Sequence, residues 1–249
     1  MEKNIKPLIP VNQKGLDKIA IELLNESIPI NDPIQIGTNS PSNPREYIIL
    51  ETADSKNNKI GLYVAKAKDF FSKNWYEAHE ALNKEDYQML TIRQYIDLIK
   101  LLKSENVYDG LKNKLKDTEI SQLKSEMIEV RAPWRAEWLD GKFSDNGDEW
   151  YLSQEHAYDS KKSGKLEERI IAKNRIKVNP LMENTKFNLN DVNQYGLITK
   201  KGTELKYWHP RDKAVAGFCA DSDGAGLSYY WCPAVSGAEL GVRRAKILK

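Results

Sequence analysis

Apolar and polar residues follow one another along the chain in patterns that predict both helices and strands. Residues 15–27 carry apolar side chains at helical spacing, which predicts a helix. Residues 28–44 hold four prolines and therefore form a loop or an extended connection. The β-rich runs 46–53 and 59–67, separated by the polar stretch 54–58, predict a hairpin.

The middle of the chain predicts two helices. One begins after Thr91, where Gln94 completes a capping-box pattern, and its apolar residues between 92 and 102 form a broad stripe that must be covered. A second begins near Thr118 and places four apolar residues on one side: Ile120, Leu123, Met127 and Val130. We expect the two helices to pack together around the turn at residues 106–110.

The remainder of the chain favours strands. Tryptophans at 134, 138 and 150 and the turn sequence at 145–148 predict a second hairpin. Residues 160–175 predict a charged, exposed connection, and residues 188–196 predict a short helix ended by Gly196. Four further strands are expected at 205–210, 214–221, 225–232 and 240–247. The fold class is therefore α+β, with helices in the middle and an antiparallel sheet completed by the C-terminus.

Charge and hydropathy exclude several classes of partner. The 38 basic and 36 acidic residues give a net charge of +2, so the chain offers no general attraction to nucleic acid. No stretch approaches the roughly 18 consecutive apolar residues of a membrane span, and the N-terminus does not resemble a signal peptide. We expect a cytoplasmic protein by default, with display at a cell surface as the alternative.

Motifs that carry chemistry are missing from the sequence. It contains no phosphate-binding loop, no dinucleotide-binding glycine pattern and no HExxH. The histidines His79, His156 and His209 are scattered, and we expect a surface or half-buried helical position for His79 and a structural role for His209. For residues 221–224, "DSDG", a turn is favoured over a calcium site. We therefore expect no metal site, no cofactor and no catalytic residue.

The two cysteines leave one question open. Cys219 and Cys232 would form a cross-strand disulfide if they faced each other, but free thiols are favoured because nothing indicates an oxidising compartment. Catalysis by either thiol would need a base, and nothing in the sequence orients His209 for that role.

The tail of the chain differs in composition from everything before it. In residues 225–232 strand alternation turns Ala225, Leu227, Tyr229 and Trp231 toward the core and the residues between them outward. In the preceding strand Val215, Gly217 and Cys219 point outward by the same reasoning, away from the core face of Ala214, Ala216, Phe218 and Ala220.

The tail also lacks a particular set of amino acids. Asparagine codons whose adenines change never yield Lys, Glu, Gln, Met or Trp. Between Ala214 and Ala238 the one residue of these types is Trp231, which we assign to the core face. Strands and turns of small residues avoid lysine and glutamate in any case, so the depletion alone does not decide the matter.

The tail resembles the variable region of proteins that retroelements diversify. The segments "EVRAPWRAEWLD" at 129–140, "YWHPRDKAVAGF" at 207–218 and "LGVRRAKI" at 240–247 are similar to an archaeal group associated with Nanoarchaeota-like organisms. The resemblance covers residues 91–249 and implies a C-type lectin fold, with residues 1–90 as an N-terminal extension. It also implies diversification of residues 214–238 by adenine-directed mutagenesis.

The resemblance implies a non-enzymatic protein that binds a macromolecular ligand, for which we expect a protein rather than a nucleic acid. Strand alternation selects six of the variable positions, the bend after Pro233 adds four, and Gly224 rests on its place in a loop. The positions are Gly217, Cys219, Gly224, Gly226, Ser228, Tyr230, Cys232, Ala234, Val235, Ser236 and Gly237. The calcium-binding signatures of sugar-binding lectins are missing from the chain.

Two alternatives stay open. One is an enzyme that shares the fold of formylglycine-generating enzymes and uses Cys219 or Cys232, although the cysteine pattern of those enzymes is not matched. The other is a structural or assembly protein of a virus, in which the helical middle would mediate association.

Overall fold

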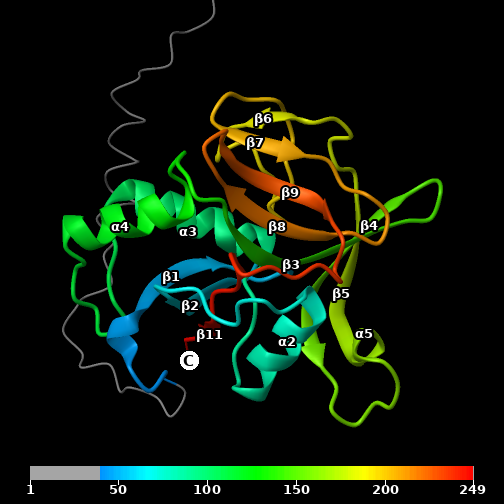
Figure 1. Cartoon of the computed structure of the whole chain (residues 1–249), viewed down its shortest axis with the longest axis horizontal. Helices are drawn as coiled ribbons and strands as arrows, with labels where there is room; N and C mark the ends of the chain where they lie inside the picture. Colours follow the sequence, from blue (N-terminus) through cyan, green and yellow to red (C-terminus); the bar gives the residue numbers. More distant parts are fainter. Residues whose placement is uncertain (1–39, 249) are drawn as a thin grey trace, which may run out of the picture. The chain divides into compact units, whose positions relative to one another are not determined.

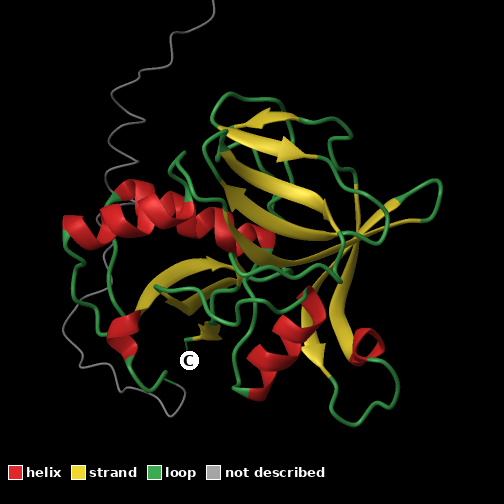
Figure 2. Ribbon diagram, in the orientation of Figure 1, coloured by secondary structure: helices red, strands yellow, loops and turns green. Residues whose placement is uncertain are grey.

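A computed structural model describes residues 40–248 of the chain. The described residues form one compact unit, in which most of the regular structure is sheet (Figures 1 and 2). The α+β fold class predicted from the sequence is therefore confirmed. The helix predicted at 15–27 lies outside the described residues.

A small sheet contains both ends of the described chain. Its strands run in the order β1-β2-β11 and have the bounds β1 Tyr47–Ala53, β2 Lys59–Ala65 and β11 Ala245–Ile247. The predicted hairpin is confirmed: a short helical turn, η1 (Pro44–Glu46), precedes it, and the Asp54 carboxylate accepts the backbone N–H groups of Lys56 and Asn58 in its turn. Because β2 pairs with the C-terminal β11, the described chain does not divide at residue 90.

Three helices lie between the hairpin and the large sheet in sequence: α2 Trp75–Lys84, α3 Ile92–Ser104 and α4 Asp117–Met127. The capping box of Thr91 and Gln94 is present as predicted. The helices α3 and α4 contact each other, and α3 also contacts β1 and β3, so it lies between the two sheets (Figure 1). Val130 was expected on the buried side of α4, but the helix ends at Met127 and Val130 is exposed.

The large sheet has the strand order β5-β4-β3-β8-β9-β7-β6, with β10 paired to β3 in parallel. Its strands are β3 Arg135–Asp145, β4 Trp150–Tyr158, β5 Ile170–Val178, β6 Thr185–Phe187, β7 Leu205–Trp208, β8 Val215–Ala220, β9 Ala225–Trp231 and β10 Leu240–Gly241. The β7–β9 pair is parallel as well. The sheet is thus larger than the small antiparallel sheet we expected, and it is mixed.

Three local predictions from the sequence are wrong. Residues 160–175 are not merely a connection, because they contain the short helix α5 (Leu166–Arg169) and the start of β5. Residues 188–196 form turns instead of a helix, since the Asn193 side chain accepts the backbone N–H groups of Tyr195 and Leu197. The expected strand 240–247 is split into β10 and β11, and Arg243 lies between them with a buried side chain.

One buried arginine joins two of the segments that carry the resemblance, and a second holds one of these segments to α4. The Arg243 guanidinium donates to the Glu137 carboxylate at 3.0 and 3.2 Å, and the Tyr95 hydroxyl donates to the same carboxylate at 3.2 Å. Arg135 donates to the backbone carbonyls of Glu126 and Arg131, each at 2.8 Å. The Arg243 bonds therefore join the C-terminal segment to β3, and the Arg135 bonds hold the start of β3 to the end of α4 and the residues after it.

Within residues 40–248, no helix combines the length and apolar character that crossing a bilayer requires.

Candidate functional site

A bulge in β9 sets the orientation of the tail. The antiparallel register pairs Gly217 with Ser228 but Val215 with Trp231, so β9 carries one extra residue between the two pairs. Paired residues of neighbouring strands lie on the same face, and the bulge therefore turns Trp231 onto the face of Gly217 and Ser228. Our assignment of Trp231 to the core face with Leu227 and Tyr229 is wrong for this reason.

Four positions that we expected to project into solvent are buried: Gly217, Cys219, Gly226 and Ser228, of which Ser228 is only 1% exposed. The Trp231 ring covers Gly217, where an added Cβ would lie 2.8 Å from ring carbons. At Gly226 an added Cβ would lie 2.0 Å from the backbone oxygen of Lys206 on β7. The expectation of an open face along both strands is therefore wrong.

Aromatic side chains occupy this face instead. Trp134 is 40% exposed, and Trp208, Tyr230 and Trp231 are half-buried. The ring centroids of Trp134 and Trp231 lie 6.1 Å apart, and those of Trp208 and Tyr230 lie 6.5 Å apart. We call these four residues the aromatic surface. Trp208 and Trp231 pack against the same buried hydrophobic cluster. This cluster therefore supports both aromatic pairs.

Two cations extend the aromatic surface. The Arg211 guanidinium lies 5.0 Å from the ring centroid of Tyr230, and the Lys206 ammonium lies 5.9 Å from that of Trp208. Both contacts fall within the range of cation–π attraction. The surface thus combines flat apolar area with positive charge at its edge.

Residues 221–224 form the turn that the sequence predicted. The Asp221 carboxylate accepts the backbone N–H groups of Asp223 and Gly224 at 2.7 and 2.9 Å. Gly224 has a φ of +155° and lies against the Lys206 side chain, so a side chain at this position would be strained.

Residues 232–237, which we call the bend, follow β9 and stand at the surface. Four of their side chains are exposed, those of Cys232, Ala234, Val235 and Ser236, and Gly237 is half-buried. The backbone is held at both ends: Trp75 donates its N–H to the Pro233 carbonyl at 3.0 Å, and Ser72 donates to Gly237 at 3.2 Å. Side chains of the bend can therefore change without loss of these backbone hydrogen bonds.

The structure thus brings six of the eleven predicted positions to the surface: Tyr230, Cys232, Ala234, Val235, Ser236 and Gly237. They adjoin aromatic residues that we did not include, namely Trp134, Trp208 and Trp231. The sequence held a signal for Trp134, because it lies in the tryptophan-flanked segment 134–138. It held none for Trp231, whose orientation depends on the bulge.

Both thiols are free, but their surroundings differ. Burial, with a smaller contribution from the Asp221 carboxylate, raises the pKa of Cys219 to about 11, so its thiol stays protonated at neutral pH. Cys232 is exposed. Within residues 40–248, no hydrogen bond joins either sulfur to a histidine: His156 bonds to Asp140, His209 bonds to Asn184, and His79 has no partner.

The expectation that the three histidines are scattered needs correction, because two of them lie together in the fold. His79 is wholly buried on α2, and it lies with Asp140 of β3 and His156 of β4 in a group whose ligand atoms are all within 4.8 Å of one another. Imidazole nitrogens and a carboxylate oxygen are ligands for a transition metal. Residue types that the sequence places far apart are therefore adjacent in the fold.

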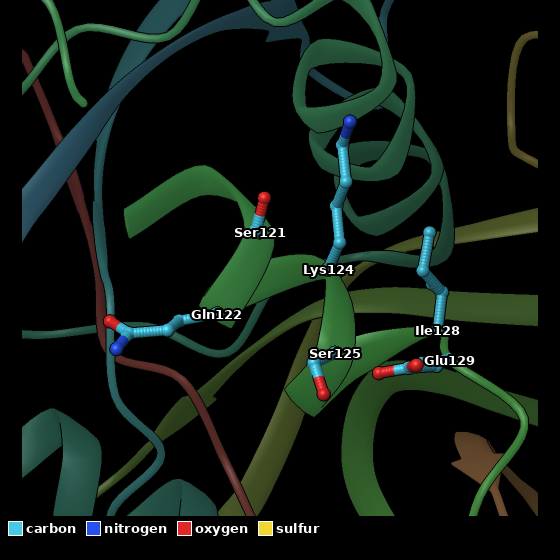
Figure 3. Close-up of a pocket in the computed structure, with 6 residues that line it drawn as sticks. All are labelled: Ser121, Gln122, Lys124, Ser125, Ile128 and Glu129. Atoms are coloured by element: carbon cyan, nitrogen blue, oxygen red, sulfur yellow. The ribbon is translucent and has the colours of Figure 1, made fainter. Parts of the chain in front are cut away.

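A hollow of about 500 Å³ lies on α4 and the residues after it. Figure 3 shows that the side chains of Gln122, Lys124 and Ser125 point in different directions around it. Polar groups that converge on one point are the mark of a small-molecule site. This hollow lacks that arrangement and adds nothing to the candidate site.

Searches against protein-family models, curated proteins and solved structures returned no match for this chain.

Proposed function

We propose that this chain is a non-enzymatic binding protein that recognises a macromolecular ligand, a protein, through the aromatic surface and the bend. The observation that carries the proposal is the exposure of the bend beside aromatic rings that the strands hold in place. Cys232, Ala234, Val235 and Ser236 are exposed on a backbone that is hydrogen-bonded at both ends.

The physical logic is that of other recognition surfaces. Tyrosine and tryptophan supply large contact areas with few rotatable bonds, and small residues adapt to the partner. Here Trp134, Trp208, Tyr230 and Trp231 supply the rigid area, and the bend supplies the small residues. Arg211 and Lys206 add positive charge at the edge, which favours a partner with acidic groups near its contact area.

Diversification by a retroelement is part of the proposal, and it rests on the resemblance of the tail. So does the C-type lectin fold, with which a mixed, mostly sheet architecture is compatible. The buried bonds of Arg243 to Glu137 join two of the resembling segments, as expected if both belong to one scaffold.

Burial limits the positions that can vary. Gly226 faces the Lys206 carbonyl and has no room for a side chain, and Gly217 lies under the Trp231 ring. We therefore propose that variation concentrates at Tyr230, Cys232 and the rest of the bend.

The test is the DNA that flanks the coding region. We expect a nearby near-copy of the sequence encoding residues 214–238, with differences confined to positions that are adenine in the copy. The proposal of diversification fails if the flanking DNA contains no such copy. The binding role has a separate test: replacement of Tyr230 and Trp208 by alanine should abolish capture of a partner without loss of fold.

A further inference from the structure

The strongest cluster of chemical groups outside the tail is the buried group of His79, Asp140 and His156, which we call the buried triad. Three different elements supply it: α2, β3 and β4. The side chains of His79, Asp140 and His156 are 0%, 3% and 4% exposed. Its residues come together through the packing of α2 against β4.

Backbone irregularities in both strands bring the triad together. Asp140 lies where the register of β3 with β8 shifts, and its N–H donates to the Leu90 carbonyl outside the ladder. In β4 the unpaired residue Glu155 has a φ of +56°, which is uncommon for any residue other than glycine. Bulges occur often beside functional sites because they redirect a side chain, and unusual backbone conformations cluster there as well.

The irregular backbone at Glu155 comes directly before His156, whose backbone N–H and ring both face Asp140. The His156 backbone N–H donates to Asp140 Oδ2 at 3.0 Å, and His156 Nδ1 lies 2.5 Å from Asp140 Oδ1. The carboxylate is thus held by two contacts from the same residue. This arrangement fixes one ring nitrogen and one carboxylate oxygen at a common point.

His79 faces this point without a hydrogen bond. Neither of its ring nitrogens has a partner within the described chain, although the residue is wholly buried. Its Nε2 lies 3.8 Å from Asp140 Oδ1, too far for a hydrogen bond but suitable for two ligands of one ion. Trp75, one helical turn earlier, packs its ring edge-on against His79 with centroids 4.2 Å apart and fixes the imidazole in this orientation.

We propose that the buried triad binds a divalent transition-metal ion of the zinc class, with His79, Asp140 and His156 as ligands. Zinc takes this combination of imidazole and carboxylate groups, and a water molecule completes the tetrahedron. Tetrahedral ligand atoms around zinc lie about 3.3 Å apart, given metal–ligand distances of about 2.0–2.1 Å. Binding of the ion at His156 Nδ1 would displace the proton between Nδ1 and Asp140 Oδ1 to solvent, and the imidazole would stay neutral with its proton on Nε2. The two ligand atoms, 2.5 Å apart without the ion, would move apart to accommodate it.

The metal joins α2 to the β3–β4 hairpin. The same junction already contains the Trp75 Nε1 hydrogen bond to the Leu139 carbonyl at 3.0 Å. The first residue of α2, Trp75, donates its backbone N–H to the Pro233 carbonyl in the bend. A metal bound at the triad therefore also stabilises the end of α2 that holds the bend. The inference does not depend on the proposed binding function.

The direct test uses the full chain, treated with a chelator and then titrated with Zn²⁺. We expect about one equivalent of zinc bound per chain by atomic emission, and a rise in Tm of roughly 5–10 °C at zinc concentrations near 100 times the Kd. A chain that binds no zinc and melts at the same temperature with and without it overturns the proposal.

A matched pair of variants locates the metal. His79→Gln should weaken zinc binding at least about 100-fold, because loss of a ligand exceeds the usual effect of losing an outer hydrogen bond. His209→Gln, at the histidine that bonds to Asn184 outside the triad, should leave the affinity unchanged. Equal effects of the two substitutions contradict the assignment.

Cobalt(II) provides a readout that needs no variant. Added to the chelator-treated chain, Co²⁺ should develop the intense visible absorption of a tetrahedral nitrogen-and-oxygen site. A spectrum that stays that of the hydrated ion contradicts the proposed ligands, even if zinc binds elsewhere on the surface.

Discussion

The bend and the buried triad are constructed in opposite ways. In the bend the backbone is fixed by hydrogen bonds from Ser72 and Trp75, and the side chains are free in solvent. In the triad the side chains are fixed and buried, and the backbone departs from regular strand geometry to place them. A surface that varies is thus recognised by exposed side chains on a fixed backbone. A cluster that binds an ion is recognised by polar side chains that are buried and fixed.

The two regions also left different signals in the sequence. The tail stands out by composition, so it can be recognised without any structure. The triad has no such signal, because His79, Asp140 and His156 lie in three separate elements and are far apart in the sequence. Substitutions in the two regions should therefore differ in their effects on stability.

The largest effect is expected at the triad carboxylate. In the chelator-treated chain, Asp140→Ala should lower the free energy of unfolding by about 3–5 kcal/mol, because it leaves the buried His156 N–H and ring without their acceptor. Urea unfolding followed by tryptophan fluorescence measures the change. Asp148→Ala, in the exposed turn of the same hairpin, should cost less than about 0.5 kcal/mol. Equal losses of stability in the two variants would show that the buried carboxylate contributes no more to the fold than an exposed one.

A pair of glycines gives the next largest effect. Gly226→Ala should cost about 2–3 kcal/mol, because the new Cβ would meet the Lys206 carbonyl on a paired strand that cannot move freely. Gly237→Ala should be nearly neutral, since the nearest atom to an added Cβ is 3.9 Å away. Thermal and urea unfolding of both variants provide the comparison. If Gly226→Ala were as harmless as Gly237→Ala, the tail face would be open and our account of its burial would be wrong.

The reactivity of the two cysteines also tests which part of the tail is buried and which part is exposed. Because its pKa is about 11 against an ordinary value of 9.0, the Cys219 thiol should have about 100-fold less thiolate and should alkylate at least that much more slowly than an ordinary thiol. Iodoacetamide labelling of the native chain followed by peptide mass spectrometry should find Cys232 modified first. In urea both should react at similar rates. Rapid labelling of native Cys219 would show that this strand is accessible.

The smallest effect is expected on the bend. Val235→Lys should change the free energy of unfolding by no more than about 0.5 kcal/mol, because the side chain is 51% exposed. The same exchange at the wholly buried Val215 is the matched control and should unfold the chain. A large loss at Val235 would mean that the bend supports the fold and is not free to vary.

Features of the fold that depend on neighbouring residues could be predicted from the sequence. The capping box of Thr91 and Gln94 and the hairpin turn at Asp54 are examples, because each is settled within a few residues. The strand β5 could also have been found: its exposed positions Lys173, Arg175 and Lys177 alternate with half-buried ones. We did not predict this strand, because the many charged residues of the segment suggested an exposed connection and drew attention away from the two-residue alternation.

Features that depend on distant partners could not be predicted. The orientation of Trp231 follows from one extra residue in β9, and no residue type marks that bulge. The burial of His79 follows from the packing of α2 against strands more than fifty residues later. At 188–196 the helical pattern was real, but the Asn193 side chain stabilised a turn instead.

Recognition through a variable bend can be tested by the DNA sequence of the tail in sibling copies of this chain. We predict that differences concentrate in the codons for Tyr230, Cys232 and residues 234–237. The codons for Gly226 and for the triad residues His79, Asp140 and His156 should stay unchanged. Differences spread evenly along the chain, or gathered at buried positions, would contradict recognition by a variable bend on a fixed scaffold.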